Sequence, residues 1–338
     1  MTQPPWRRER REHFPGVPAW SLATSRLAPE QFGVSRLEDV TREWAWGENS
    51  TGGDNTGENS TGESSAGDDG AGGDGAGGDG AGGDGAGGEG TSGGSGRADG
   101  AGVRVCVLDT GVDGGHPRVG GLERSLVVAD DRDLTVVGCD PVDPVGHGTA
   151  CAGIIRSIAP AVSLTSVRVL TDGRSGSGAA LLAGLRWAVE EGFDLVNLSL
   201  STTRSQYLPE LHELADRAYF RRCLLVASAH NMPVVSFPWT FSSVISVASH
   251  DEPDPMTYYY NPAPPAEFLA RGVRVPVAWR RGREIRSTGN SFAAPHITGI
   301  CALILSRHRW MTPFQLKSVL YLAASNVVAS KGGAHVRA

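Results

Sequence analysis

The stretch Val103-Arg-Val-Cys-Val-Leu-Asp-Thr-Gly111 contains the residues that decide the fold. Its first six residues are rich in valine, a β-branched residue that favours strands, and Arg104 is their only charged member. An aspartate follows directly, and a glycine comes two residues later. The pattern predicts a short buried strand that places a carboxylate at its C-terminal end.

Further apolar runs alternate with helical patterns toward the C-terminus. Strands are predicted at residues 162–170, 195–200, 224–227 and 244–248, and helices at 179–190, 208–221 and 292–305. Near-continuous apolar strands alternating with helices are typical of a parallel sheet covered on both faces. Such α/β sheets carry their sites at the strand ends. The run Tyr258-Tyr-Tyr260, which three prolines follow, predicts an ordered loop packed against this body.

The first third of the chain has a different composition. Residues 47–100 contain 23 of the 46 glycines, and the unit Gly-Ala-Gly-Gly-Asp repeats between Gly70 and Gly90. Such a segment cannot bury enough apolar surface to offset the entropy of ordering it, so we expect a disordered linker with a mean span of roughly 40 Å. A calcium-binding β-roll is the alternative, because glycine and aspartate recur. However, the apolar residue that fills each turn of such repeats is missing.

Residues 1–46 hold four of the eight tryptophans: Trp6, Trp20, Trp44 and Trp46. This content favours a docking segment that has a partner, and a poorly ordered extension is the alternative. We therefore expect an N-terminal extension (1–46), a linker (47–100) and a folded domain (101–338).

Charge and hydropathy exclude several classes of partner. The linker carries eleven acidic residues and one arginine, net −10 against −6 for the whole chain, which leaves about +4 for the remainder. A nucleic-acid partner is not expected from so weak a field. The longest apolar run, residues 297–305, is too short to span a bilayer, so no membrane partner is expected.

The compartment is predicted from the N-terminus and the cysteines. Residues 1–12 are rich in arginine, but no apolar stretch follows them, so no secretory signal is expected. Five cysteines without framework spacing suit free thiols in a reducing environment. These features predict a cytoplasmic protein.

Three short motifs place reactive side chains at strand and helix ends. Asp109 ends the first strand, His147 lies in Gly146-His-Gly-Thr149, and Ser291 lies in Gly289-Asn-Ser-Phe-Ala-Ala-Pro-His296. A serine hydroxyl becomes an effective nucleophile when a histidine removes its proton, and a carboxylate fixes the tautomer of that imidazole. Alone, the aspartate motif is common in parallel sheets and the histidine motif also fits a helix start. Together and in this order, they favour an Asp–His–Ser catalytic triad.

On these motifs, the chain resembles the subtilisin-like serine peptidase family over about residues 101–325. The order Asp, His, Ser is the one found in subtilisin. The resemblance implies a three-layer fold with a mostly parallel seven-stranded sheet and helices on both faces. It also implies a serine endopeptidase that cleaves peptide or protein substrates through an acyl-enzyme.

The family resemblance assigns further residues. Asn231, at the end of Leu225-Val-Ala-Ser-Ala-His-Asn231, matches the side-chain donor of the oxyanion hole, which the backbone N–H of Ser291 completes. Ser175-Gly176 and Ser199-Leu200-Ser201 resemble the strands that hold an extended substrate by β-pairing. Many members use structural calcium, but no cluster of oxygen ligands is identifiable here, so no metal or other cofactor is predicted.

The sequence departs from the family at several positions. His230 and Ser201 stand where the family usually has glycine. In the family, both positions line the pocket for the residue before the cleaved bond. The added side chains therefore predict narrow specificity for a small or polar residue in that pocket. Asn290 stands in place of a threonine, and its amide is a further candidate donor near the oxyanion. Cys151 follows His147 by one helical turn, either as a small buried residue or as a thiol near the site.

Two other functions compete with an active endopeptidase. The departures at Ser201, His230 and Asn290 leave open a catalytically weak or inactive pseudoprotease that binds peptides. A scaffold in which residues 1–46 recruit a partner is the third hypothesis.

Overall fold

Nine strands form one sheet within the residues that the computed structural model describes, which are 40, 42–47, 97–170, 177–263 and 265–327. The strands of this part of the chain, including a separate hairpin, are β1 (Arg104–Asp109), β2 (Arg124–Val128), β3 (Val136–Gly138), β4 (Ser163–Arg168), β5 (Leu195–Leu198), β6 (Leu224–Ser228), β7 (Ile245–His250), β8 (Tyr258–Tyr260), β9 (Phe268–Arg271), β10 (Val275–Trp279) and β11 (Arg283–Ser287). Its helices are α3 (Arg42–Trp46), α4 (His147–Ile158), α5 (Gly178–Glu190), the short 3₁₀ helix η3 (Ser205–Tyr207), α6 (Leu208–Phe220), α7 (Asn290–Arg307) and α8 (Pro313–Leu322).

The sheet is parallel except at its two edges. Its strand order is β3-β2-β4-β1-β5-β6-β7-β9-β8. The strands from β2 to β9 in this order pair in parallel, whereas β3 and β8 pair antiparallel with their neighbours. The mostly parallel sheet expected from the family resemblance is therefore present, with one antiparallel strand added at each edge.

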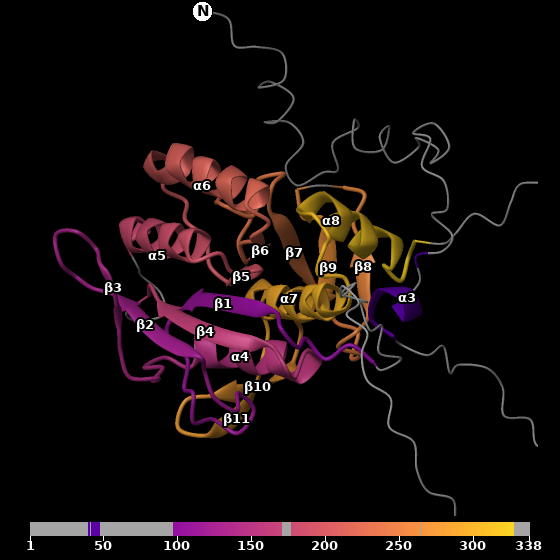
Figure 1. Ribbon diagram of the computed structural model, residues 1–338, viewed down its shortest axis with the longest axis horizontal. Helices are drawn as coiled ribbons and strands as arrows, with labels where there is room; N and C mark the ends of the chain where they lie inside the picture. The colour runs from indigo at the N-terminus through magenta and orange to yellow at the C-terminus, as the bar shows by residue number, and fades with distance from the viewer. Residues whose placement is uncertain (1–39, 41, 48–96, 171–176, 264, 328–338) are drawn as a thin grey trace, which may run out of the picture. The chain divides into compact units, whose positions relative to one another are not determined.

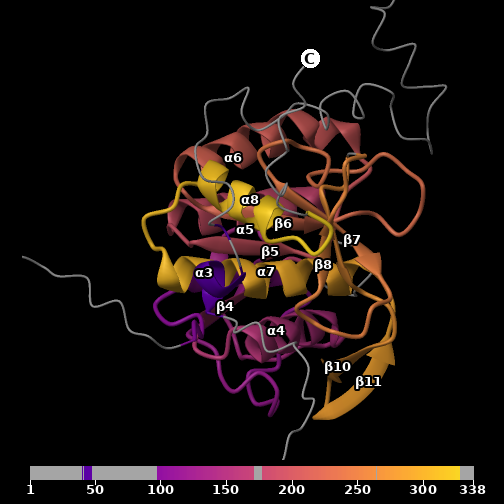
Figure 2. The same ribbon diagram turned by 90° about the vertical axis from the view of Figure 1, so that its right-hand side faces the viewer.

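Helices cover both faces of this sheet (Figures 1 and 2). Because side chains alternate along a strand, β1 sends Val105 and Val107 into the core beneath α4 and α7, and Cys106 and Leu108 into the core beneath α5 and α6. This double burial explains why the strands are continuously apolar in sequence.

Helix α7 is the central helix of its layer. Its residues from 292 to 305 are all buried, so it is surrounded by protein around its whole circumference. Gly299 allows α4 to approach closely, because a Cβ there would lie only 2.8 Å from Cβ of Ile158. The backbones of α4 and α7 therefore approach closely. This close packing helps to hold the N-terminal ends of the two helices near one another.

Most of the predicted elements are confirmed within a few residues of their expected ends. The loop expected at Tyr258–Tyr260 is wrong: these residues form β8, which pairs with β9. Three consecutive aromatic residues have high strand propensity, and Pro262 and Pro265 lie in the bends that follow. Within the described residues, none of the helices combines the length and the apolar character that crossing a bilayer requires.

The end of the N-terminal extension packs against α7. Trp46 is fully buried, and Trp44 stacks on His308 with ring centroids 4.1 Å apart. His308 Nε2 also lies 3.0 Å from the carbonyl oxygen of Trp44. This short part therefore packs against the folded domain. Residues 1–39 and 41 lie outside the described residues, and the docking of residues 1–46 to a partner stays a prediction.

The two ends of the predicted linker meet. The amide of Ala98 donates a hydrogen bond of 3.1 Å to the carbonyl oxygen of Trp46. The expected span of roughly 40 Å is therefore wrong for the described residues that flank this segment, Trp46 and Ala98. Residues 48–96 themselves lie outside the described residues, and the division into domains stays a prediction.

Candidate active site

Asp109 lies at the C-terminal end of β1, in the middle of the parallel sheet. Its side chain is fully buried, and its Oδ1 accepts a hydrogen bond of 2.8 Å from the amide of Thr110. Gly111 turns the chain directly afterwards, with a φ of 101° that only glycine adopts readily. The strand and this turn together fix the position of the carboxylate.

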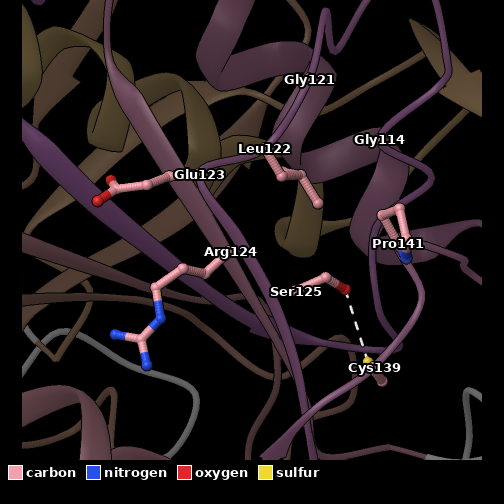
Figure 3. A pocket seen from close by; sticks show the side chains of 8 residues that line it. All are labelled: Gly114, Gly121, Leu122, Glu123, Arg124, Ser125, Cys139 and Pro141. Carbon is pink, nitrogen blue, oxygen red and sulfur yellow. Dashed lines mark hydrogen bonds between the residues drawn. The ribbon is translucent and has the colours of Figure 1, made fainter.

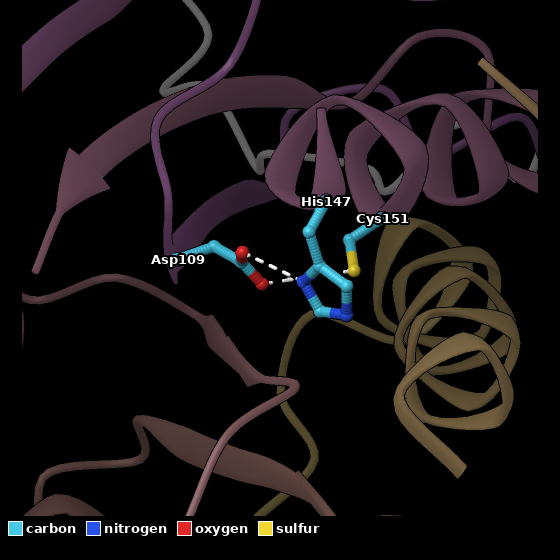
Figure 4. Close-up of side chains that lie close together, drawn as sticks. All are labelled: Asp109, His147 and Cys151. Atoms are coloured by element: carbon cyan, nitrogen blue, oxygen red, sulfur yellow. Dashed lines mark hydrogen bonds and ion pairs between the residues drawn. The ribbon is translucent and has the colours of Figure 1, made fainter. Parts of the chain in front are cut away.

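His147 is the first residue of α4 and faces Asp109 (Figure 4). Its Nδ1 lies 2.8 Å from Asp109 Oδ1, and 22 % of its side chain is exposed. Burial lowers the pKa of His147, but the charge and hydrogen bond of Asp109 and the charge of Asp143 outweigh it, so the pKa lies above its ordinary value.

Asp143 organises the backbone around this pair. Its Oδ1 accepts hydrogen bonds from Thr110 Oγ1 and from the amides of Val145 and Gly146, at 2.8–3.0 Å. Its Oδ2 accepts from both the amide and the hydroxyl of Thr149, at 2.9 and 2.7 Å. One buried carboxylate thus joins the turn after β1 to the first turn of α4.

Ser291 is the second residue of α7, where backbone N–H groups are free of helical partners. Its carbonyl oxygen accepts a 2.8 Å hydrogen bond from Ser199 Oγ, and Cys151 Sγ lies 3.6 Å from the same oxygen. The ring of Phe292 lies 5.5 Å from that of His147, centroid to centroid. These contacts place the start of α7 beside the start of α4.

The hydroxyl of Ser291 forms no hydrogen bond with any residue that the structure describes, and His147 Nε2 is equally without a partner there. The second nitrogen of the imidazole is therefore available on the side away from Asp109. Apo sites often show long catalytic hydrogen bonds that shorten when substrate binds.

Asn231 faces the same place as Ser291. A Cβ built on Gly289 would lie 3.3 Å from Ser291 Oγ and 3.6 Å from Asn231 Nδ2, so both groups lie beside one point. The Oδ1 of Asn231 accepts a 2.9 Å hydrogen bond from the amide of Asn290. This bond fixes the amide plane and leaves Nδ2 to donate elsewhere.

Asn290 is not placed as an oxyanion donor. Its Oδ1 accepts hydrogen bonds from the amide and hydroxyl of Ser249, and its Nδ2 donates to the carbonyl oxygen of His230. Both ends of the amide therefore connect α7 to the segments after β6 and at the end of β7. The suggestion that Asn290 could donate near the oxyanion is wrong in this arrangement.

The residues predicted to contact substrate are only partly described. Ser175 and Gly176 lie outside the described residues. Ser199 is buried, and its side chain holds the carbonyl of Ser291, while Leu200 and Ser201 are half-buried after the end of β5. His230 is half-buried, and its Nδ1 accepts a 3.0 Å hydrogen bond from the amide of Met232.

The sequence motifs around His147 do not indicate the central place of Asp143 in this network. The available signal was an aspartate four residues before His147, beside glycines and threonines that can donate to it. The role of the Ser199 side chain was missed as well, because only its backbone was expected to act.

One group of potential metal ligands lies close together among the described residues. Asp109, His147 and Cys151 have ligand atoms within 4.8 Å of one another. Burial, and then the charge of Asp109, raise the pKa of the Cys151 thiol well above its ordinary value, so the thiol stays protonated. The group is therefore a hydrogen-bonded pair with a neutral thiol packed against it, a poor set for a hard cation such as calcium.

A pocket of about 320 Å³ lies beyond the turn after β1 (Figure 3). Its charged side chains already have partners, because Glu123 accepts from Ser163 and Arg124 pairs with Glu191. Ser125 Oγ and Cys139 Sγ approach to 3.6 Å at its wall. It adds no group to the arrangement around His147.

Comparison with known proteins gives consistent results. The sequence profile described as the Subtilase family matches residues 100–336. Subtilisin DY of Bacillus licheniformis is 28 % identical over 243 residues, which are 68 % of this chain and 85 % of that protein. Thermitase of Thermoactinomyces vulgaris is 29 % identical over 224 residues, which are 63 % of this chain and 78 % of that protein. The chain also superposes on the crystal structure of a cold adapted subtilisin-like serine proteinase with a TM-score of 0.57 and 28 % sequence identity. The match covers 69 % of this chain and 86 % of the proteinase.

Proposed function

Because the chain belongs to the subtilase family of serine endopeptidases, we propose that Asp109, His147 and Ser291 are its catalytic triad. The observation that carries this proposal is the 2.8 Å contact between Asp109 Oδ1 and His147 Nδ1, with Nε2 left free at the start of α7. No other pair of described residues joins a buried carboxylate to an imidazole in this way beside a serine on a helix N-terminus.

Each member has one task in the proposed reaction. His147 Nε2 removes the proton of Ser291 Oγ, which attacks the carbonyl carbon of the cleaved bond and forms a tetrahedral intermediate. The imidazolium then gives its proton to the amine as the C–N bond breaks, which leaves the acyl-enzyme. His147 next removes a proton from water, which attacks the acyl carbon, and the imidazolium returns the proton to Ser291 Oγ as the acid leaves. Asp109 holds the proton on Nδ1 and stabilises the imidazolium, so it orients the base rather than taking its proton.

Asn231 Nδ2 and the amide of Ser291 form the proposed oxyanion hole. Support comes from the hydrogen bond between Asn231 Oδ1 and the amide of Asn290, since it leaves Nδ2 free to donate. Both Nδ2 and Ser291 Oγ also lie beside Gly289. A donor held in place before the reaction stabilises the developing charge without further reorganisation.

Narrow specificity remains part of the proposal. Ser201 and His230 add side chains where the family usually has glycine, so the pocket for the residue before the cleaved bond favours a small or polar side chain. Profiling with a peptide library tests this, and equal cleavage after Phe, Leu and Ala would reject it.

The test of the proposed triad uses a fluorophosphonate probe, which labels an activated serine. Wild-type protein and the Ser291→Ala variant are reacted side by side after circular dichroism has shown that both are folded. Labelling that depends on Ser291 supports the endopeptidase. Folded wild-type protein that is not labelled would instead support the pseudoprotease. The observation that favours this alternative is that the Ser291 hydroxyl forms no hydrogen bond with the described residues.

The cytoplasmic location and a partner for residues 1–46 also remain proposals. The five cysteines are all unpaired thiols, which suits a reducing compartment. Fractionation of the native host with an antibody to this chain tests the location.

A further inference from the structure

A second pocket lies near the C-terminal ends of β7 and β9. It measures about 400 Å³ and is lined by residues from the loop after β7, the end of β9, the loop that follows it, and β11: Asp251, Pro253, Arg271, Val273, Arg274 and Arg286. We call it the arginine pocket. Three of its six lining residues are arginines, and Asp251 is its only acidic one.

The positive charge of the arginine pocket is not neutralised by the protein. None of its three guanidinium groups forms an ion pair with any residue that the structure describes. Asp254, which lies in the same loop as Asp251, already accepts hydrogen bonds from the amide of Met256 and the hydroxyl of Thr257. The surrounding segment 271–286 contains six arginines and one glutamate, and that glutamate, Glu284, pairs with Arg118 outside the pocket.

The side chain of Arg271 is a second, independent feature that favours an anionic ligand. Its Nε is buried and has no hydrogen-bond acceptor among the described residues. Leaving such a donor buried and unpaired is unfavourable, and the penalty is larger for a charged group. Burial, and then the charge of Arg286, lower the pKa of Arg271, while the smaller effect of the Asp254 charge raises it. An acceptor between Arg271 and Arg286 would relieve both the unpaired donor and the repulsion.

The arginine pocket is connected to the nucleophile by short chain segments. Arg286 lies five residues before Ser291, at most about 17 Å along an extended chain. The amide of Arg274 donates to Thr288 Oγ1, and the amide of Gly289 donates to the carbonyl oxygen of Gly272, both at 2.9 Å. An extended peptide that occupies the active site therefore reaches the pocket within about five residues of the cleaved bond.

The sheet order indicates which side of the substrate reaches it. Ser201 and His230, proposed to line the pocket for the residue before the cleaved bond, follow β5 and β6. The arginine pocket is instead built from β11 and from segments at or after the ends of β7 and β9. Ser291 lies between them, because its carbonyl is held by Ser199 and its neighbour Asn290 is held by Ser249 of β7. The pocket therefore lies on the side that the leaving amine occupies.

We propose that the arginine pocket binds the carboxylate of an aspartate or glutamate on the leaving-group side of the cleaved bond, and so selects substrates that are acidic there. The inference rests on the proposed endopeptidase function. Arginine suits this task because its planar group donates two parallel hydrogen bonds to a carboxylate.

Matched peptides test this proposal. A glutamate is moved through the five positions after the cleaved bond, and each peptide is compared with its glutamine counterpart. At one or two neighbouring positions, we expect kcat/KM to be about tenfold higher for glutamate, and the preference to fall as salt is added. The preference should disappear in Arg286→Gln and reverse toward a lysine peptide in Arg286→Glu. Arg281→Gln, which removes an exposed arginine of the same hairpin outside the pocket, should retain it.

Equal cleavage of glutamate and glutamine peptides at all five positions would overturn the proposed role of the arginine pocket, while the proposed endopeptidase function would stand. If no peptide is cleaved, the same pairs carrying a fluorophore are titrated onto the Ser291→Ala variant, and binding is followed by anisotropy. Tighter binding of the glutamate peptide that depends on Arg286 supports the pocket even if the proposed activity fails. Equal binding of the two peptides overturns it.

Discussion

The two ends of α7 are used in different ways. Its N-terminal end presents Ser291. There the carbonyl oxygen of Ser291 accepts a hydrogen bond from Ser199 Oγ, and the amide of Asn290 donates one to Asn231 Oδ1. Its C-terminal end, some 27 Å away by helical rise, carries the aromatic contact between His308 and Trp44 and the buried Trp46. Polar geometry dominates one end and apolar burial dominates the other.

If the proposed mechanism holds, the N-terminal end of α7 serves catalysis and its C-terminal end anchors the N-terminal extension. Groups at the N-terminal end should change turnover when they are altered, because their effect depends on distances of a few tenths of an ångström. Groups at the C-terminal end should change the free energy of unfolding, because burial is not directional. Substitutions at each end can show whether the separation holds.

The largest effect is expected for Asp109→Asn at the N-terminal end. An asparagine amide favours the wrong tautomer of His147, so kcat should fall by about 10⁴-fold while the fold is retained. Steady-state kinetics on a sensitive fluorogenic peptide measures the loss. Asp113→Asn makes the same change four residues later, outside the pair, and should leave kcat within a few-fold of wild type. Similar losses in both variants would contradict the assigned role of Asp109.

Trp46→Ala tests the other end of the helix. Removing a fully buried indole should lower the free energy of unfolding by about 3–5 kcal/mol. Turnover per folded molecule should remain unchanged at a temperature where the variant is folded, since the ring lies far from Ser291. Urea unfolding gives the first quantity, and active-site titration with kinetics gives the second. Trp310→Ala, at a residue that is 58 % exposed, is the control and should change stability little. A loss of turnover in folded Trp46→Ala would show that the two ends of α7 are coupled and would contradict the separation.

Asn231→Ala should lower kcat by about 10²–10³-fold with a smaller change in KM, because the donor acts on charge that develops during the reaction. The measurement is a comparison of kcat and KM on one peptide. Asn290→Ala is the matched control: its amide is consumed by Ser249 and His230, so it should affect stability more than turnover. Equal effects of the two variants on kcat would reject Asn231 as the donor.

The same contrast explains how much could be predicted from the sequence. Asp109, His147 and Ser291 sit in motifs tied to strand and helix ends, so their elements and their approximate place were predictable. Trp44 and Trp46 were noticed only through composition, because the surface that they cover is made by α7 and α8, far along the chain. Local patterns do not encode such contacts between distant segments.

Side-chain networks were the other part that could not be predicted. Asn290 was expected to face the oxyanion, yet Ser249 and His230 engage its amide from two different strand ends. Tyr258–Tyr260 became a strand because β9 was available to pair with it. In both cases the partner, rather than the local sequence, decides the outcome.

The smallest effect is expected for Asp143→Asn, and it separates positioning from electrostatics within the catalytic end. The charges of Asp109 and Asp143 face His147, and the neutral thiol of Cys151 packs beside it. Since the Asp143 charge raises the pKa of His147, its removal lowers that pKa. His147 must be neutral to act as a base, so the acid limb of kcat/KM against pH should move to lower pH. Asp140→Asn, at an exposed residue of the same loop, should leave the limb in place. If Asp143 only holds the backbone, through its bonds to Thr110 and Thr149, stability falls while the limb does not move.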